Sequence, residues 1–216
     1  MTILFDLDGT LIDSTDAILQ SFEHAFTQHN HTPPAQKQIL ALIGHPLDFM
    51  FAHLGVNSGA VNSFVTSYKQ HYKMINRQMT TLLPRAKEAV ELADSFATLA
   101  VVTTKTGIYS VDLLKHLGIM HHFKFVIGRE DVVNPKPDPE PILKALHRLE
   151  CDPAHSWMIG DTTMDINCAK KANIKSVAVK CGYGDHNELH RCSEFVQKDS
   201  YDAVQFIRRF ETMTKG

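Results

Sequence analysis

Hydrophobic residues along the chain follow two patterns. Strand-like segments occur at the start of the chain and again beyond residue 82, whereas residues 15–80 have only helical spacing. Short, mainly apolar segments that read as strands lie at residues 3–5, 99–102, 123–127, 157–159 and 176–179, and the continuous apolar run 99–102 is typical of a strand buried on both faces of a parallel sheet. From residue 82 onward, segments with apolar residues at helical spacing separate these runs. Strands that alternate with helices are joined by right-handed crossovers, which place helices on both faces of one sheet. The pattern therefore predicts an α/β fold with a Rossmann-like parallel sheet.

Residues 15–80 show only the helical pattern and contain no strand-like run. The spacing predicts helices over residues 15–31, 35–43, 47–54 and 58–79. Prolines and glycines separate these segments, because neither residue type continues a helix well. We therefore expect an α/β core made of residues 1–14 and 81–216, with residues 15–80 as a smaller, all-helical insert.

Composition and charge exclude several classes of protein. Of the 216 residues, 44% are hydrophobic and 21% charged, which provides apolar side chains for a substantial core. The formal net charge of −2 gives no basic surface for nucleic acid or an acidic membrane. No apolar stretch reaches the length of a membrane span, and the first apolar run stops at Asp6, as expected of a buried strand and not of a signal peptide. We therefore expect neither a nucleic-acid nor a membrane partner.

The four cysteines and 13 histidines show no metal-ligand spacing. Because the cysteines form no CxxC pair and no secretion signal precedes them, we expect free thiols in a reducing cytoplasm. The histidines lack acidic or cysteine partners at ligand spacing, and we interpret them as solvated polar side chains.

The first apolar run leads directly into Asp6 and Asp8, followed by the turn-forming pair Gly9-Thr10. In an extended segment, residues i and i+2 point to the same side, so the two carboxylates would project together. Such like charges are costly unless a cation lies between them or one carboxyl holds a proton. The pair therefore indicates a metal ligand and nucleophile, or an acid/base pair. A simpler interpretation is that one aspartate ends the strand and the other begins an Asp-Gly turn.

Polar residues also follow the other predicted strands of the core. In a parallel sheet the carboxyl ends of the strands meet at one edge, where ligands bind. The polar residues at this edge would be Asp6, Asp8, Thr103, Lys105, Lys136, Asp161 and Asp165. Carboxylates suit a hard cation such as Mg²⁺, whereas a threonine hydroxyl and a lysine ammonium suit a phosphate. Each residue alone has a structural explanation, such as a helix cap or a solvated charge, so the prediction depends on the combination.

These motifs, in this order, resemble those of the haloacid dehalogenase-like phosphatases. The resemblance rests on Asp6-Leu7-Asp8-Gly9-Thr10, Thr103, Lys136 and Gly160-Asp161-Thr162-Thr163-Met164-Asp165, and it spans the whole chain. The helical insert resembles the cap of the phosphoglycolate phosphatase group, and Ile43-Gly44-His45-Pro46-Leu47 is similar to the cap loop that faces the active site in that group.

The resemblance implies a role for each matching residue. Asp6 would be the nucleophile that forms an aspartyl-phosphate, and Asp8 the general acid and base. The expected Mg²⁺ ligands are the Asp6 side chain, the Asp8 backbone carbonyl and Asp161, while Asp165 would orient the metal's waters. Substrate-binding residues would be Thr103, Thr104, Lys136 and, in the cap, His45.

Three positions bear on how far the resemblance extends. Thr104 stands where many members have asparagine, which is a mild change. Pro84 is expected to open a helix over 85–96. Arg85, which follows it, stands where related proteins often have glycine. Asp8 argues against carbon–halogen chemistry, because the true dehalogenases lack an acid two residues after the nucleophile.

The leading hypothesis is a phosphomonoester phosphatase similar to phosphoglycolate phosphatases, acting on a small phosphorylated metabolite as a monomer or homodimer. A sugar-phosphate mutase, a pyrophosphatase or a nucleotidase uses the same chemistry and stays open. A phosphoacceptor signalling domain is disfavoured because it would lack the helical insert. An inactive binding module is disfavoured because all the acidic residues of the motifs are present. A dinucleotide-binding fold is disfavoured because Gly182-Tyr183-Gly184 lacks the third glycine.

Overall fold

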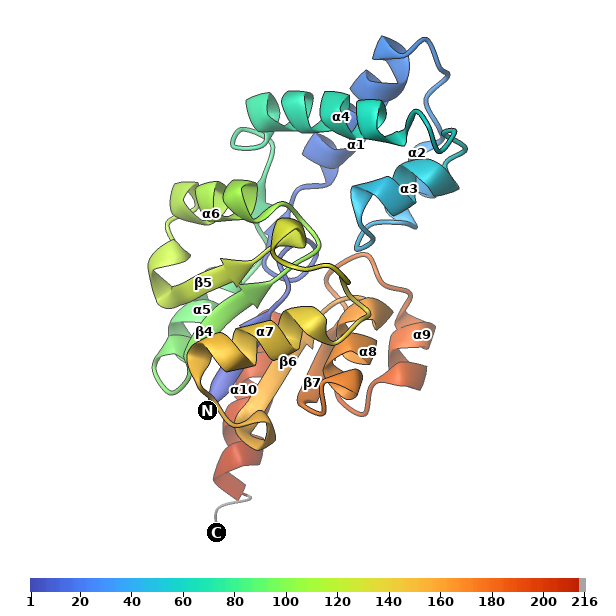
Figure 1. Ribbon diagram of the computed structural model, residues 1–216. Helices are drawn as coiled ribbons and strands as arrows, with labels where there is room; N and C mark the ends of the chain where they lie inside the picture. The colour runs from blue at the N-terminus through green and yellow to red at the C-terminus, as the bar shows by residue number, and fades with distance from the viewer. Residues whose placement is uncertain (214–216) are drawn as a thin grey trace. The chain divides into compact units, whose positions relative to one another are not determined.

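The computed structural model describes residues 1–213. The chain divides into two compact units, one containing residues 1–13 together with the chain from residue 82 onward, and the other Ser14–Thr81 (Figure 1). The first unit holds all six strands of the main sheet, whereas the second contains helices.

The main sheet of the first unit is parallel throughout, with the strand order β5-β4-β1-β6-β7-β8. Its strands are β1 (Thr2–Phe5), β4 (Thr98–Val102), β5 (Phe123–Ile127), β6 (Ser156–Gly160), β7 (Lys175–Val179) and β8 (Val196–Gln197). The central strand β1 pairs with β4 and β6, and its Phe5 is in register with Val101 and Ile159. The predicted parallel α/β fold is confirmed, and the carboxyl ends of β1, β4 and β6 lie side by side.

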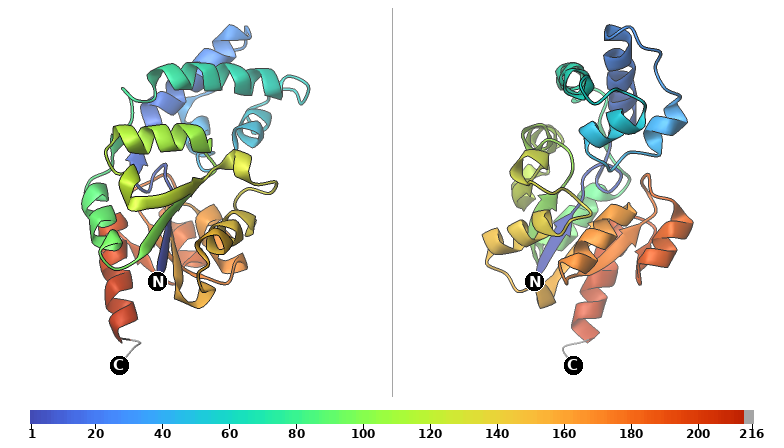
Figure 2. Two further views of the ribbon diagram at one scale, coloured as in Figure 1. Left: turned by 60° about the vertical axis from the view of Figure 1, so that its left-hand side comes forward. Right: turned by 45° about the vertical axis from the view of Figure 1, so that its right-hand side comes forward.

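Helices cover both faces of this sheet (Figure 2). They are α5 (Ala86–Asp94), α6 (Gly107–His116), α7 (Glu140–Leu149), α8 (Thr163–Lys171), α9 (His186–Cys192) and α10 (Ser200–Met213). Alternate residues of β1 point to opposite faces, as the period of a strand requires. Ile3 and Phe5 pack in one buried cluster with residues of α5, α6 and α10. Leu4 packs in another with residues of α7 and α8.

The second unit consists of α1 (Thr15–Gln28), α2 (Gln36–Leu40), α3 (Leu47–His53) and α4 (Val61–Ile75). Its centre is a group of aromatic rings whose centroids lie 4.7 to 6.2 Å apart in the contacting pairs, formed by Phe22, Phe26, Phe51, Phe64 and Tyr68. The helices are shorter than predicted, because the flanking residues form turns. Two further short strands, β2 (Ile12–Asp13) and β3 (Thr81–Leu82), pair at the two points where the chain passes from one unit to the other.

One expectation about a helix start was wrong. Helix α5 begins at Ala86, so Pro84 lies before the helix and not at its first position. Between them, Arg85 has a φ of +61°, a left-handed conformation that favours glycine. The Arg85 guanidinium contacts the carboxylates of Asp199 and Asp202 and lies 5.0 Å from the ring centre of Tyr201. These contacts explain how a long side chain occupies this turn.

Two other observations bear on the sequence-based expectations. Within residues 1–213, no helix has both the length and the apolar character needed to cross a bilayer. Cys151, Cys168, Cys181 and Cys192 are all free thiols.

Candidate active site

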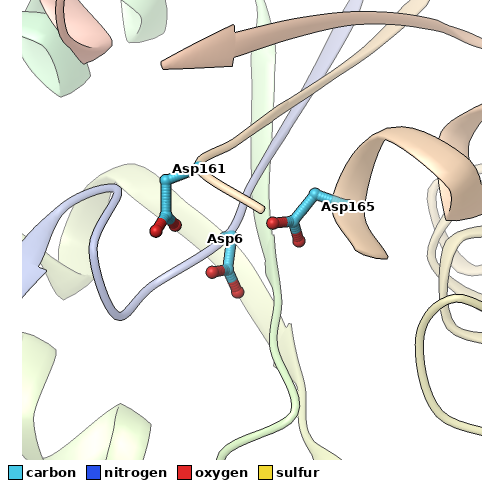
Figure 3. Close-up of side chains that lie close together, drawn as sticks. All are labelled: Asp6, Asp161 and Asp165. Carbon is cyan, nitrogen blue, oxygen red and sulfur yellow. The ribbon is translucent and has the colours of Figure 1, made fainter. Parts of the chain in front are cut away.

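Three carboxylates from distant parts of the chain gather at the carboxyl end of the sheet (Figure 3). Asp6 follows β1, Asp161 follows the neighbouring strand β6, and Asp165 lies in the first turn of α8. One oxygen from each lies within 4.8 Å of the others, and all three side chains are buried. Within residues 1–213, this is the one group of three or more histidine, cysteine or acidic side chains that lie close enough together to hold a metal ion.

Lys136 joins this cluster from the loop that follows β5. Its Nζ donates hydrogen bonds to Asp6 Oδ1 at 2.7 Å, Asp165 Oδ1 at 2.5 Å and the carbonyl oxygen of Val102 at 3.1 Å. Only 4% of Lys136 is exposed, so the ammonium is removed from water and surrounded by protein acceptors. Burying a charge is costly unless it is paired and hydrogen-bonded, and these contacts satisfy that requirement.

The cluster contains more negative than positive charge. Burial, together with repulsion from Asp165 and Asp8, raises the pKa of Asp6 from 3.8 to about 7 despite the attraction of Lys136. Burial and the same kind of repulsion raise the pKa of Asp161 well above its usual value. Burial opposes the charged form of Lys136, but attraction to Asp165 and Asp6 outweighs it and raises its pKa. Three carboxylates therefore face one ammonium, and this donor set fits a divalent cation that prefers oxygen ligands.

The Asp161 carboxylate is held by a turn at the other end of the chain. After β1 the backbone reverses, with the amides of Leu11 and Ile12 both donating to the carbonyl oxygen of Leu7. The turn passes through Gly9, whose φ is +81°, and the Thr10 hydroxyl donates to Asp161 Oδ1 at 2.9 Å. The Gly-Thr pair of the first motif thus positions the aspartate that follows β6.

A second segment, which the sequence pattern did not predict, also holds Asp161. After β7, the amide of Tyr183 donates to Asp161 Oδ2 at 2.8 Å. A β-carbon on Gly182 would lie 2.1 Å from that same oxygen, so the backbone approaches the carboxylate too closely for any side chain. The signal in the sequence is Gly182-Tyr183-Gly184, whose two glycines were interpreted above only as an incomplete dinucleotide-binding motif.

Asp165 is positioned by its own helix. Its Oδ2 accepts hydrogen bonds from the Thr162 amide at 3.0 Å and the Thr162 hydroxyl at 2.6 Å, which caps the start of α8. Its Oδ1 is the oxygen that contacts Lys136. One carboxylate therefore ties the helix start to the buried lysine.

The Asp8 side chain lies outside the three-carboxylate group and pairs with a different lysine. Lys105 Nζ is 3.0 Å from each of the two Asp8 carboxylate oxygens. The side chains of Lys105 and Asp8 are 10% and 13% exposed. Asp6 and Asp8, only two residues apart, thus have different electrostatic partners.

The remaining predicted site residues lie at two places. Thr103, the residue directly after β4, is buried, and its hydroxyl oxygen accepts a hydrogen bond from the Lys105 amide at 3.1 Å. Thr104 follows it and is half-buried. His45 belongs to the helical unit, where its ring stacks on Phe49 with 4.4 Å between the centroids. Burial and the nearby His53 lower the pKa of His45.

Known proteins are similar to this chain in sequence and in fold. Residues 3–179 match the family model of the haloacid dehalogenase-like hydrolases. Pyrophosphatase PpaX of Oceanobacillus iheyensis is 32% identical over 209 residues, covering 95% of this chain and 96% of that protein. A haloacid dehalogenase-like hydrolase family protein from Streptococcus pneumoniae has a TM-score of 0.86 and 27% identity, covering 95% of this chain and 97% of that one.

A structure from Haemophilus somnus, described as a predicted phosphoglycolate phosphatase, has the same fold, with a TM-score of 0.84 and 24% identity over 95% of this chain and 96% of that one. The family model covers most of the chain, and the identity to the Oceanobacillus protein extends over nearly its full length. Together with the motifs that suggested the resemblance, these similarities show that this protein belongs to the haloacid dehalogenase-like hydrolases.

Proposed function

We propose that the protein is a Mg²⁺-dependent phosphatase that transfers a phosphoryl group from a small substrate to Asp6 and then to water. The observation that carries the proposal is the buried group of Asp6, Asp161 and Asp165 with Lys136 at its edge. A group with more carboxylates than cations fits a divalent metal and an anionic substrate better than a structural role.

Asp6 and Asp8 would have separate roles in the two steps. In the first step, an oxygen of Asp6 forms a bond to phosphorus, the bond to the leaving oxygen breaks, and a proton from Asp8 goes to that oxygen. In the second step, Asp8 takes a proton from water as the water oxygen bonds to phosphorus, and Asp6 is released. The different partners of Asp6 and Asp8 support this division, because each carboxyl is in its own electrostatic environment.

The proposed metal ligands are the side chains of Asp6 and Asp161 and the backbone carbonyl of Asp8, with Asp165 orienting the metal's waters. When bound, Mg²⁺ would neutralise charge on the phosphoryl oxygens. Asp161 is well placed to be a metal ligand, because hydrogen bonds from Thr10 and Tyr183 orient its two carboxylate oxygens. These hydrogen bonds orient the carboxylate in the way that supporting residues of metal sites commonly do.

The phosphoryl oxygens would be held by Thr103, Thr104 and Lys136. Thr103 supports this role because its oxygen accepts from the Lys105 amide, which leaves the hydroxyl hydrogen to donate. Lys136 already donates to Asp6, Asp165 and the carbonyl oxygen of Val102. To bind a phosphoryl oxygen it would share a hydrogen between two acceptors or exchange one of these contacts.

We further propose that residues 15–80 act as the cap and that His45 helps to select the substrate. Phosphoglycolate is the leading substrate by the family resemblance. Pyrophosphate is the second candidate, because relatives that match this chain at 31% to 35% identity are named pyrophosphatases.

The experiment that tests the proposed function measures phosphate release by the purified full-length protein, with excess Mg²⁺ or with EDTA. The panel would contain a chromogenic phosphate ester, phosphoglycolate, pyrophosphate, a sugar phosphate and a nucleotide. We expect the wild type to hydrolyse at least one substrate only when Mg²⁺ is present. We expect the Asp161→Asn variant to be inactive even at high Mg²⁺ concentration. Hydrolysis that continues in EDTA, or none of any substrate with Mg²⁺ present, would refute the proposal.

A further inference from the structure

We propose that Lys105 binds a negative charge on the leaving group, so that the site favours phosphoric esters and anhydrides whose leaving group is itself an anion. The proposal rests on the proposed function, because it takes Asp8 as the group that protonates the leaving oxygen. It goes further by assigning a substrate class and a residue that recognises it. Carboxylate-bearing alcohols and inorganic phosphate are leaving groups of this class.

The first observation is the position of the Lys105 ammonium beside Asp8. Its Nζ lies 3.0 Å from each Asp8 oxygen. A group that donates a proton to the leaving oxygen must come within hydrogen-bond distance of it. The leaving oxygen would therefore sit next to Asp8, and a charge carried on the leaving group close to that oxygen would be within reach of Lys105.

The second observation is that the backbone of Lys105 is fixed on both sides. Its amide donates to Thr103 Oγ1 at 3.1 Å, and its carbonyl oxygen accepts from the Arg129 amide at 3.0 Å. Two residues later, the Gly107 amide donates to Glu130 Oε2 at 2.8 Å, which closes the turn onto the start of α6. The ammonium therefore extends from an ordered turn next to the residue proposed to hold the phosphoryl group, and such preorganised groups discriminate between ligands effectively.

The third observation concerns charge. Lys105 and Asp8 are both largely removed from water, and an ammonium in such a place favours an anionic partner. The other lysine of the site, Lys136, donates to Asp6 and Asp165 deeper in the cluster. When an anionic leaving group accepts hydrogen bonds from Lys105, the Asp8 oxygens are released to face the leaving oxygen. A neutral leaving group offers Lys105 no such exchange.

The test compares substrates that differ in this charge and little else. Phosphoglycolate and ethyl phosphate are similar in size, but the leaving group of phosphoglycolate carries a carboxylate; pyrophosphate is the second anionic case. The kcat/KM of each would be measured with Mg²⁺ for the wild type, Lys105→Met, Lys105→Arg and a control, Lys87→Met. Lys87 is an exposed residue of α5 whose Nζ lies 3.8 Å from Glu91. Thermal unfolding of each variant would establish that it is folded.

We expect Lys105→Met to lower kcat/KM for phosphoglycolate and pyrophosphate by about 30-fold or more, as the loss of a hydrogen bond to a charged group does. Ethyl phosphate should lose several-fold less, Lys105→Arg should recover part of the preference, and Lys87→Met should match the wild type. An equal loss for all three substrates would show that Lys105 only positions Asp8, and would overturn the inference while leaving the phosphatase intact. If the wild type hydrolyses neither phosphoglycolate nor pyrophosphate, the inference fails; the proposed function fails with it only if no substrate of the wider panel is hydrolysed.

Discussion

A β-carbon on Gly182 would lie 2.1 Å from Oδ2 of Asp161. The same position would place it 2.4 Å from the carbonyl oxygen of Gly9. The loop after β7 therefore lies against both a proposed metal ligand and the turn of the first motif. Separations this short cannot be relieved without moving the carboxylate or the backbone.

Gly182→Ala is expected to weaken Mg²⁺ binding by about tenfold or more, because changes to residues that orient metal ligands typically cost this much. The added methyl group would push Asp161 away from the position fixed by Thr10 and Tyr183. Isothermal titration of the metal-free protein with Mg²⁺ measures the effect directly. The matched control is Gly59→Ala, because no atom lies within 4 Å of a β-carbon built at Gly59. Equal affinities for the two variants would show that the loop does not position the ligand.

Lys136→Met is expected to lower the free energy of unfolding by about 3 kcal/mol at about pH 8, since removing one partner of a buried ion pair leaves unpaired charge. The variant would leave the Asp6 and Asp165 carboxylates without their buried cation. Added Mg²⁺ should restore part of the loss. Denaturant unfolding with and without Mg²⁺ measures both effects, and Lys87→Met again serves as the surface control. A loss no larger than that of the control would contradict the electrostatic account of the cluster.

Mg²⁺ should stabilise the protein more at about pH 8 than at about pH 6. The pKa of Asp6 is raised from 3.8 to about 7, so the folded, metal-free protein holds a proton that the unfolded chain has lost between these values. Stability contributed by that proton is lost as the pH rises towards 7. Mg²⁺ requires the ionised carboxylate, so below about pH 7 its binding must displace the proton, and the apparent affinity falls.

The measurement for this prediction is the difference in melting temperature between samples with Mg²⁺ and with EDTA across this pH range. Asp6→Asn is the control, because the amide has no titratable proton that Mg²⁺ would displace in this pH range. The pH dependence of the Mg²⁺ effect should weaken in that variant. A wild-type Mg²⁺ effect that is equal at both pH values would contradict the assignment of Asp6 as a ligand with a raised pKa.

His45→Ala is expected to change the ranking among phosphate esters while reducing activity on a small chromogenic ester much less. His45 and Phe49 stack in the helical unit, and burial, with the nearby His53, lowers the pKa of His45, which favours a neutral imidazole able both to donate and to accept hydrogen bonds. Comparing kcat/KM over several esters tests this expectation. His116→Ala, at an exposed histidine of α6, is the control. A uniform effect on all esters, or none, would remove His45 from the substrate site.

Sequence patterns predicted the features that depend on regular geometry. Parallel strands bring their carboxyl ends to one edge of the sheet, so the convergence of Asp6, Asp161 and Lys136 follows from the order of strands and motifs. Residues Phe123–Ile127 form the predicted strand with the predicted bounds. The two-residue strands β2, β3 and β8 were not predicted, because segments this short carry no periodicity.

Contacts specified by three-dimensional packing could not be predicted in this way. The strand pattern placed Lys105 at the same edge of the sheet as Asp8, but no local pattern indicates that these two residues, 97 positions apart, pair with each other. The left-handed conformation of Arg85 depends on carboxylates from the start of α10. The closeness of Gly182 to Asp161 depends on the path of a loop from β7, and a glycine in a sequence indicates freedom without showing what lies nearby.

The most direct test of the whole account is the turnover of Asp6→Asn with saturating substrate and Mg²⁺. Asp94→Asn, an exposed carboxylate of α5 that pairs with His122, is the matched control. Because the amide is a poor nucleophile and a poor metal ligand, kcat should fall by about three powers of ten or more, the usual consequence of removing a covalent catalyst. Asp94→Asn should keep the wild-type rate, and both variants should unfold cooperatively. A folded Asp6→Asn protein that keeps more than about a thousandth of the wild-type kcat would contradict the assignment of Asp6 as the nucleophile.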